Sequence, residues 1–283
     1  MTPEILRLSA FTDTPDGGNP AGVVLEAEGL EAAQMMAIAA EVGFSETAFL
    51  VAGAQPGAYL TRYFAPQSEI PFCGHATIAT AVALAERDGV GTIVLETAAG
   101  RVAVQTREHD GRILATLTSV QAHVEDVSDE HLKRALAALG WSREDLDPAF
   151  PPRIGFGGAR HLILAAATRE RLAELDYDFD ALLALSQELD LITVDLVWRE
   201  HDDVWHARNP FPLGGVVEDP ATGAAAAAFG AYLRELGLVA RGGAFTIHQG
   251  HDMGRPSTLR VELPAEGDAV RVSGGAVVLP EPG

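Results

Sequence analysis

The chain has 283 residues, 47% of them hydrophobic, and its 40 acidic residues outnumber its 20 basic ones, which gives a formal net charge of −20. A surface this acidic repels phosphate backbones and anionic lipids, so neither nucleic acid nor a membrane is expected as a partner. The single cysteine excludes an intramolecular disulfide and any metal site made of several cysteines.

The N-terminal segment and the hydropathy of the chain favour a cytoplasmic location. MTPEILRLSAFTDTPDGGNPAG has neither the basic start nor the apolar core of a secretory signal. No run of about 18 uncharged apolar residues is present that could span a membrane. At this length the chain can bury a substantial core, as one large domain or as two of ordinary size.

The first part of the chain is expected to consist mostly of strands. Its segments are short, rich in β-branched residues and bounded by Gly, Pro or Asp, a pattern typical of strands. Two helices interrupt them: one over residues 30–43, with apolar residues at helical spacing, and one that follows His75, runs to about Glu86 and is stopped by Asp88-Gly89. The expected strands cover residues 5–11, 21–27, 46–52, 58–64, 92–98, 101–107 and 112–118.

The second part is expected to contain the same kinds of elements, short strands with a few helices between them. Helices are expected over residues 129–140 and 179–189 and after Gly223, while the polar, Pro-rich residues 141–155 are expected to form a loop. Strands are expected over residues 159–167, 192–198, 202–208, 244–250, 258–264 and 269–279.

This order of elements favours an α+β fold of two similar halves, each wrapping sheet around one apolar helix. The predicted boundary lies at the turn between residues 120 and 129, so the halves cover residues 1–122 and 123–283, with the last strand free to return to the first half. The alternative, a doubly wound parallel sheet, would need a regular alternation of strands and helices that this chain lacks.

An internal repeat links the two halves. EIPFCGHATIATAVAL (69–84) and EDPATGAAAAAFGAYL (218–233) agree at six of sixteen positions, at an offset of 149 residues. Each copy places Glu, Pro and Gly before an apolar helix. The first N–H groups of such a helix lack partners and carry partial positive charge, and Gly lets a ligand come close. We therefore predict that the helix starts at Gly74 and Gly223 bind one carboxylate in a shared cleft. The alternative is that Pro and Gly only punctuate two helix starts.

Four side chains near these helix starts could take part in chemistry. A positive helix end would lower the pKa of His75, whose neutral ring could then donate a hydrogen bond; the alternative is a capping or core histidine. The same helix end would lower the pKa of Cys73 and make it a nucleophile; the alternative is a small buried hydrophobic residue. Asp219 could exchange protons with a ligand or merely cap its helix. Glu46, at the start of a strand, is either an ordinary strand-edge residue or a general base whose pKa is raised by burial.

Five motifs occur in an order that resembles a known family. GGNPAGVVL, GFSETAFL, RYFAPQSEIPFCGHATIATA, EDPATGAAAAAFGAYL and the closing HQGHDMGRPSTLRVEL are similar to the PhzF family of phenazine-biosynthesis isomerases, over nearly the whole chain. The resemblance implies the diaminopimelate epimerase fold, in which two pseudo-symmetric domains each wrap strands around a central helix. It also implies a cofactor-independent isomerase that transfers a proton at carbon of a small carboxylic acid, with no metal, and it is compatible with a homodimer.

The resemblance also assigns roles to single residues. It makes Glu46 the catalytic general base, with His75 and Asp219 as the other catalytic groups. The sequence departs from the family pattern at two places. Position 224 is Ala, where the family usually has Ser, and residues 208–212 read RNPFP, where relatives of the phenazine enzyme tend to keep Arg-x-Phe-x-Pro. Both departures leave the natural substrate open. The implied substrate-binding residues are Asn19, Gly74, Thr222, Gly223 and Ala224.

Two other functions are also compatible with the sequence. One is a non-catalytic protein that binds small acids on the same fold. The other is an epimerase or racemase with an unpaired base, because a symmetric two-thiol mechanism needs a second cysteine where the repeat places Thr222.

Overall fold

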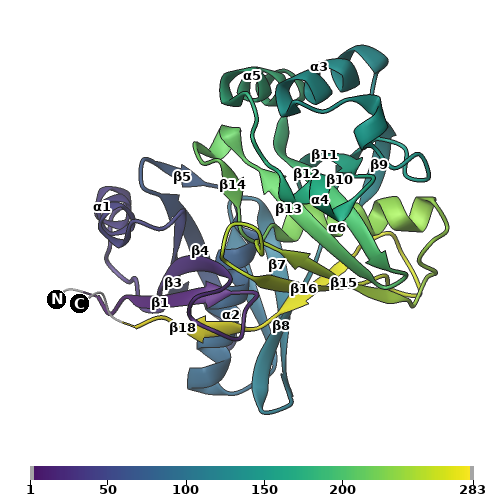
Figure 1. Cartoon of the computed structure of the whole chain (residues 1–283). Helices are drawn as coiled ribbons and strands as arrows, with labels where there is room; N and C mark the ends of the chain where they lie inside the picture. The colour runs from purple at the N-terminus through teal and green to yellow at the C-terminus, as the bar shows by residue number, and fades with distance from the viewer. Residues whose placement is uncertain (1–2, 281–283) are drawn as a thin grey trace. The chain divides into compact units, whose positions relative to one another are not determined.

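A computed structural model describes residues 3–280 of the chain (Figure 1). It divides into two compact units: one holds the described residues up to Thr118 together with Ser273 onward, and the other is Ser119–Val272. Each unit consists of a mixed sheet and a few helices, so the α+β class predicted from the sequence is confirmed. Among residues 3–280, no helix has the length and apolar character needed to cross a membrane.

The N-terminal unit is built on strands joined mostly as antiparallel neighbours. The first strand pairs antiparallel with the second and with a strand from the end of the chain, and the second and third strands run parallel. The strands are β1 (Leu6–Ala10), β2 (Asn19–Val24), β3 (Glu46–Ala52), β4 (Ala58–Ala65), β5 (Ser68–Ile70), β6 (Thr92–Thr97), β7 (Gly100–His109), β8 (Arg112–Thr118), β17 (Arg271–Gly274) and β18 (Ala276–Val278).

The helix α2 (Gly74–Asp88) is the centre of this unit, and strands of the unit surround it (Figure 1). Every residue from His75 to Ala85 is buried, and most of them are Ala, Thr or Val. A helix that is apolar on all sides has to be buried on all sides, and its small side chains let the strands approach closely. On the other face of the sheet, α1 (Ala32–Val42) packs through Met35 and Ala39 against Phe49 and Phe64.

The C-terminal unit repeats this plan. Its strands form an antiparallel sheet except for the parallel pairs β11–β12 and β13–β15. The strands are β9 (His123–Asp126), β10 (Arg153–Phe156), β11 (Arg160–Ala165), β12 (Leu191–His201), β13 (Val204–Pro210), β14 (Glu218–Asp219), β15 (Ala244–Gln249) and β16 (Ser257–Glu262), and the helices are α3 (Asp129–Leu139), η1 (Arg143–Asp145), α4 (Arg169–Ala173), α5 (Phe179–Leu189), η2 (Pro212–Gly214) and α6 (Gly223–Glu235).

The central helix of this unit is α6, in which Ala225–Leu233 are all buried. Gly157, directly after β10, lies so close to it that a Cβ atom on this residue would stand 2.6 Å from the carbonyl oxygen of Ala224. Only glycine permits this contact, so glycine sets the distance between sheet and helix. The opposite face of the sheet is covered by α3 and α5, which lie side by side (Figure 1) and bury Leu136 and Leu185.

A matching ion pair precedes both central helices. In the N-terminal unit Arg62 on β4 donates two hydrogen bonds to Glu69 on β5, at 2.7 and 2.6 Å. In the C-terminal unit Arg208 on β13 does the same to Glu218 on β14, at 3.0 and 2.5 Å. The first pair is 33% and 38% exposed, whereas the second is only 9% and 4% exposed. The internal repeat therefore extends to a tertiary contact whose surroundings differ between the units.

Three sequence-based expectations were wrong. The segment 141–155, expected to be a loop, contains η1 and the start of β10, and the turn expected at 120–129 contains β9. The single strand expected over 269–279 is two strands, β17 and β18. The missed strands have only three or four residues, too few for the alternation of polar and apolar residues to be recognised, and they form because neighbouring strands supply their hydrogen-bond partners.

Candidate active site

Two predicted site residues of the N-terminal unit, Asn19 and Glu46, lie against the imidazole ring of a third, His75. The carboxylate oxygen Oε2 of Glu46 is 3.2 Å from Nε2 of His75, and the amide nitrogen of Asn19 is 3.1 Å from Nδ1. Asn19 and Glu46 are the first residues of the parallel neighbours β2 and β3, and His75 is in the first turn of α2. The ends of two strands and one helix thus bring together residues that are 56 positions apart in sequence.

The carboxylate of Glu46 is buried, with 14% of the side chain exposed, but it is not fully satisfied. Although Oε2 is close to the ring of His75, the two groups are not aligned for a hydrogen bond, and no described residue donates one to this oxygen. A buried carboxylate oxygen without a donor is a ready proton acceptor.

The pKa values correct three expectations from the sequence. Burial favours the neutral acid of Glu46, but the contact with His75 outweighs it, so the pKa of Glu46 is lowered rather than raised. Burial would likewise lower the pKa of His75, yet contacts with Cys73 and Glu46 raise the pKa of His75 well above its usual value. Burial and the charge of Glu46 raise the pKa of Cys73, so the helix end does not make it a thiolate.

The start of α2 can receive an anion. Neither a side-chain cap nor an acidic first-turn residue satisfies its N-terminal N–H groups within the described part of the chain, and the same holds for α6. At α2 the Thr77 hydroxyl donates back to the carbonyl of Cys73 at 2.7 Å, which fixes the residue before Gly74. Backbone donors and the helix dipole therefore favour negative charge at Gly74 and at Gly223.

The second group of predicted site residues lies in the C-terminal unit, before α6. The Thr222 hydroxyl donates to Oδ2 of Asp219 at 2.6 Å. The side chain of Gln249 on β15 accepts from the backbone N–H of Thr222 at 3.1 Å and donates to the Asp219 carbonyl at 2.8 Å. Gln249 was not predicted as a site residue, although it stands in the closing motif HQGHDMGRPSTLRVEL. That Asp219 and the group around Glu46 face one ligand remains a prediction.

Buried polar side chains form a hydrogen-bonded chain across the sheet, and one of them, Asn209, is on β13, the strand that pairs with the strand of Asp219. Nδ1 of His161 is 2.8 Å from the Thr193 hydroxyl, which donates to Asn209 at 2.6 Å, and Asn209 donates to Asp195 at 3.0 Å. Asn209 is the backbone neighbour of Asp219 in the pair β13–β14. Burial lowers the pKa of His161 to about 3 and raises the pKa of Asp195 to about 7, so both are neutral in mildly acidic solution.

Replacement of Asp195 with Asn is expected to increase stability at pH 8. A carboxyl whose folded pKa is raised from 3.8 to about 7 stabilises the fold below pH 3.8, and this contribution is lost as the pH rises through 7. Asn keeps an oxygen that can accept from Asn209 and cannot ionise. The gap in pKa sets an upper limit of roughly 4 kcal/mol for the gain. Urea unfolding of both proteins at pH 5 and pH 8 measures it; an equal difference at both pH values would contradict the titration of Asp195.

Glu46, Cys73 and His75 are also the one group, among the described residues, whose possible ligand atoms all lie within 4.8 Å and could hold a metal ion. A metal would need the Cys73 thiolate and a neutral His75. The raised pKa values of both groups work against that combination.

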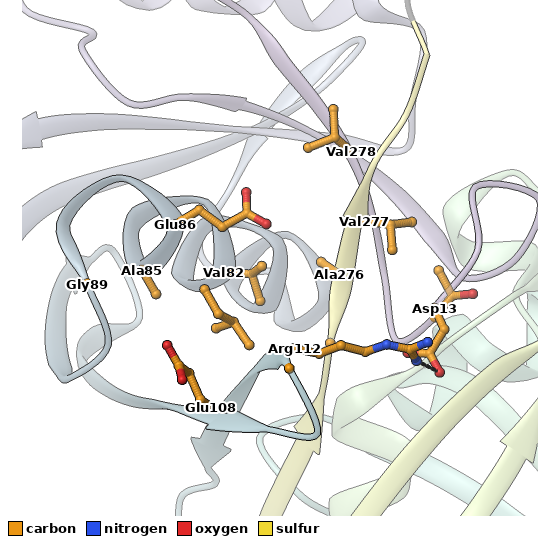
Figure 2. Close-up of a pocket in the computed structure, with 14 residues that line it drawn as sticks. Asp13, Val82, Ala85, Glu86, Gly89, Glu108, Arg112, Ala276, Val277 and Val278 are labelled. Carbon is orange, nitrogen blue, oxygen red and sulfur yellow. Dashed lines mark ion pairs between the residues drawn. The ribbon is translucent and has the colours of Figure 1, made fainter.

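A separate hollow of about 740 Å³ lies in the N-terminal unit (Figure 2). It is formed by the end of α2, the hairpin between β7 and β8, and β18, and Glu86, Glu108 and the ion pair of Asp13 with Arg112 supply its charged groups. None of the predicted site residues lines it. Its acidic side chains would repel a carboxylate, so the candidate site remains at the helix starts.

Comparisons with known proteins identify what the chain is similar to. A family model described as phenazine biosynthesis-like protein (PhzC-PhzF) matches residues 8–281. The uncharacterized isomerase YfhB of Bacillus subtilis is 32% identical, over 95% of this chain and 94% of that protein. Trans-2,3-dihydro-3-hydroxyanthranilate isomerase of Pseudomonas chlororaphis is also 32% identical, over 95% of both chains.

Solved structures agree with these relatives. The PhzF family protein of Bacillus anthracis aligns with a TM-score of 0.88 and 26% identity, over 99% of this chain and 98% of that one. A probable proline racemase of Agrobacterium radiobacter aligns with a TM-score of 0.66 and 15% identity, over 98% and 91%, which concerns the fold alone. The predicted epimerase-like fold is confirmed.

Proposed function

Because the chain belongs to the PhzC-PhzF family of phenazine biosynthesis-like isomerases, we propose that it transfers a proton between carbon atoms of a small carboxylic acid, with Glu46 as base and no cofactor. The observation that supports this most directly is the buried Oε2 atom of Glu46, which lacks a hydrogen-bond donor among the described residues and lies 3.2 Å from His75. A lowered pKa keeps Glu46 charged, and therefore basic, at neutral pH.

In the proposed mechanism the helix start at Gly74, next to Glu46 and His75, binds the substrate carboxylate. Glu46 accepts the proton from carbon, and the electron pair of the broken C–H bond moves into conjugation, where the helix dipole stabilises the developing negative charge. A new C–H bond then forms at another carbon, with a proton returned by Glu46 or donated by protonated His75. In the second case Glu46 recharges His75 across their 3.2 Å contact, so both residues regain their starting state.

Asn19 can support His75 through this cycle. An amide group can present either its NH₂ or its oxygen to the ring, so Asn19 can pair with the neutral or with the protonated imidazole. The amide of Asn19 is 2% exposed, which prevents water from taking its place. We assign Asn19 to the positioning of His75 as well as to the substrate-binding surface expected from the sequence.

The relatives suggest which acids to test first. Trans-2,3-dihydro-3-hydroxyanthranilate is the compound named for the Pseudomonas isomerases, and it carries a carboxylate. In this chain Ala224, in the first turn of α6, has no hydroxyl to offer such a ligand. We therefore propose a small carboxylate as the class of substrate, with this compound as one candidate.

Incubation with candidate acids in D₂O tests the proposal. Nuclear magnetic resonance should show a shifted C–H position or deuterium at carbon for at least one acid, with no organic cofactor added. An acid that binds but shows neither rearrangement nor exchange would favour the alternative, a non-catalytic acid-binding protein. Exchange at one carbon without rearrangement would favour an epimerase with an unpaired base.

Cys73 is expected to be dispensable for this chemistry. Its Sγ atom is 3.4 Å from Nδ1 of His75, but its pKa is raised, and its counterpart in the repeat is Thr222, so no second thiol can complete a symmetric mechanism. Cys73→Ala should keep most of the activity and lose only a little packing. A loss of turnover as large as that of Glu46→Gln would show that the thiol is catalytic.

A further inference from the structure

Three histidines of the C-terminal unit form a cluster that the proposed chemistry does not use. His206 on β13 and His248 on β15 are direct neighbours in the parallel pair of these strands. His251 follows two residues after β15. The ring centres of His206 and His248 are 5.4 Å apart, those of His248 and His251 are 5.3 Å apart, and those of His206 and His251 are 6.1 Å apart.

These separations match those of imidazoles around one metal ion. With Zn–N bonds of about 2.0–2.1 Å and tetrahedral angles, the ring centres of two ligating histidines lie roughly 5 Å apart. The planes of the three rings are inclined to one another by 50° to 74°, so the rings are not stacked. Edge-to-face packing of aromatic rings gives similar separations, so the partners of the ring nitrogens decide between packing and a metal site.

Two ring nitrogens of the cluster are buried without a partner. Nδ1 of His206 and Nδ1 of His248 have no hydrogen-bond partner among residues 3–280. Nε2 of His206 lies 2.6 Å from the carboxylate of Glu200, so this nitrogen carries the proton and Nδ1 keeps its lone pair. A carboxylate that receives the outer N–H of a histidine is the usual companion of a metal-binding imidazole.

The third histidine is held in place by a tight turn. Gly250 has φ +74°, and a Cβ atom on it would meet the carbonyl oxygens of Arg255 and Pro220. The N–H of Arg255 donates to the Gly250 carbonyl at 2.9 Å, and that of Gly254 donates to the His251 carbonyl at 3.1 Å. These contacts fold the chain back after β15, so that His251 comes to stand over the strand beside His248.

Neighbouring charges do not block this cluster. Asp252 forms an ion pair with Arg169 at 2.8 Å, and Glu200 is the one carboxylate in contact with a ring of the cluster among the described residues.

We propose that His206, His248 and His251 bind a divalent transition-metal ion of the zinc type, with Glu200 orienting His206. Imidazole nitrogen suits Zn²⁺, Ni²⁺, Cu²⁺ and Co²⁺ and not the harder ions Mg²⁺ and Ca²⁺. The three nitrogens do not yet converge to within 4.8 Å, unlike the donor atoms of Glu46, Cys73 and His75. Binding would require a ring to rotate about its Cβ–Cγ bond, a torsion for which the energy profile is broad.

The proposed metal site would hold the turn before α6 in place. Gln249 lies between His248 and Gly250, and its side chain holds both the Thr222 N–H and the Asp219 carbonyl. A metal bound through His248 and His251 fixes the backbone on both sides of Gln249. The proposed ion therefore has a structural role, and it stands whether or not the protein is catalytic.

Zinc titration of the full chain, first freed of metal with a chelator, tests the site. Calorimetry should show one equivalent of Zn²⁺ bound, and the complex should melt at a higher temperature than the apoprotein. Glu200→Gln should weaken binding by about 10- to 100-fold, and His248→Ala and His251→Ala should weaken it by more. His109→Ala, on an exposed histidine of the N-terminal unit, is the matched control and should bind as the unmodified chain does.

Cobalt distinguishes this site from the group around Cys73. Co²⁺ bound by imidazoles should give the visible absorption of a tetrahedral site without a thiolate charge-transfer band, and Cys73→Ala should leave it unchanged. The proposal is overturned if no equivalent of Zn²⁺ binds, if binding survives the double replacement His248→Ala/His251→Ala, or if Cys73→Ala abolishes it.

Discussion

Replacing Glu46 with Gln is expected to lower turnover by about 10²- to 10⁴-fold, the contribution typical of a positioned acid–base group. Gln keeps the shape of the side chain at the start of β3 but cannot accept a proton from carbon. Binding of a substrate-like carboxylic acid should survive, because the backbone N–H groups at the start of α2 can bind the anion without help from Glu46. Turnover and ligand affinity are measured for the variant beside the unmodified protein.

The pH dependence gives an independent readout of the same residue. Glu46 acts as a base only when ionised, so turnover is lost as the pH falls through its pKa, which lies below the ordinary value of 4.5. Glu46→Gln should remove this acidic limb from whatever turnover remains. Glu41→Gln, an exposed change on α1, is the matched control and should leave both turnover and the limb unchanged. Full turnover in Glu46→Gln would remove Glu46 from the mechanism and leave His75 and Asp219.

Arg208→Met is expected to destabilise the C-terminal unit by about 3–5 kcal/mol. The change leaves the carboxylate of Glu218 buried, with 4% of its side chain exposed, and without the guanidinium that satisfies both of its oxygens. Arg208 also donates to the carbonyl of Ala173 at 2.5 Å, so a link to α4 is lost as well. Chemical denaturation monitored by tryptophan fluorescence measures the change in the free energy of unfolding.

The internal repeat supplies the control for this experiment. Arg62→Met breaks the corresponding pair with Glu69, which is more than one third exposed on the Glu side, and exposed ion pairs contribute about 0–1 kcal/mol. The double change Arg208→Met/Glu218→Leu removes both buried charges and should recover most of the lost stability. Equal effects of Arg62→Met and Arg208→Met would show that burial does not decide the strength of these pairs.

The sequence predicts the helices of this protein well because their signals are local. Residues 30–43 carry apolar side chains at helical spacing and stop at Gly43, and α1 ends there with Gly43 at φ 73°. The repeat around Gly74 and Gly223 likewise identifies the two helices that the units are built around. Short strands such as β9 and β10 escape prediction because their stability comes from partners elsewhere in the chain.

The candidate site was predictable only in part, for the same reason. Nothing in the periodicity distinguishes Glu46 from an ordinary strand-edge residue; its assignment came from the family resemblance. The directions of the pKa values depend on three side chains that meet only in the folded protein, so a helix-dipole argument applied to His75 and Cys73 alone had the wrong sign. Gln249 and the polar chain from His161 to Asp195 also depend on contacts between distant strands.

The pairing of β18 with β1 bears on how the protein is synthesised. Val278 lies opposite Leu8, so the N-terminal unit needs residues that are translated after the whole of the second unit, whereas Ser119–Val272 is one continuous stretch. Domains usually fold in the order in which they are made, but here the second unit can be complete while the first still lacks an edge strand. During translation β1 should therefore expose unpaired backbone groups until β18 has emerged from the ribosome, which makes this strand the point where a nascent chain would recruit a chaperone or mispair with another chain.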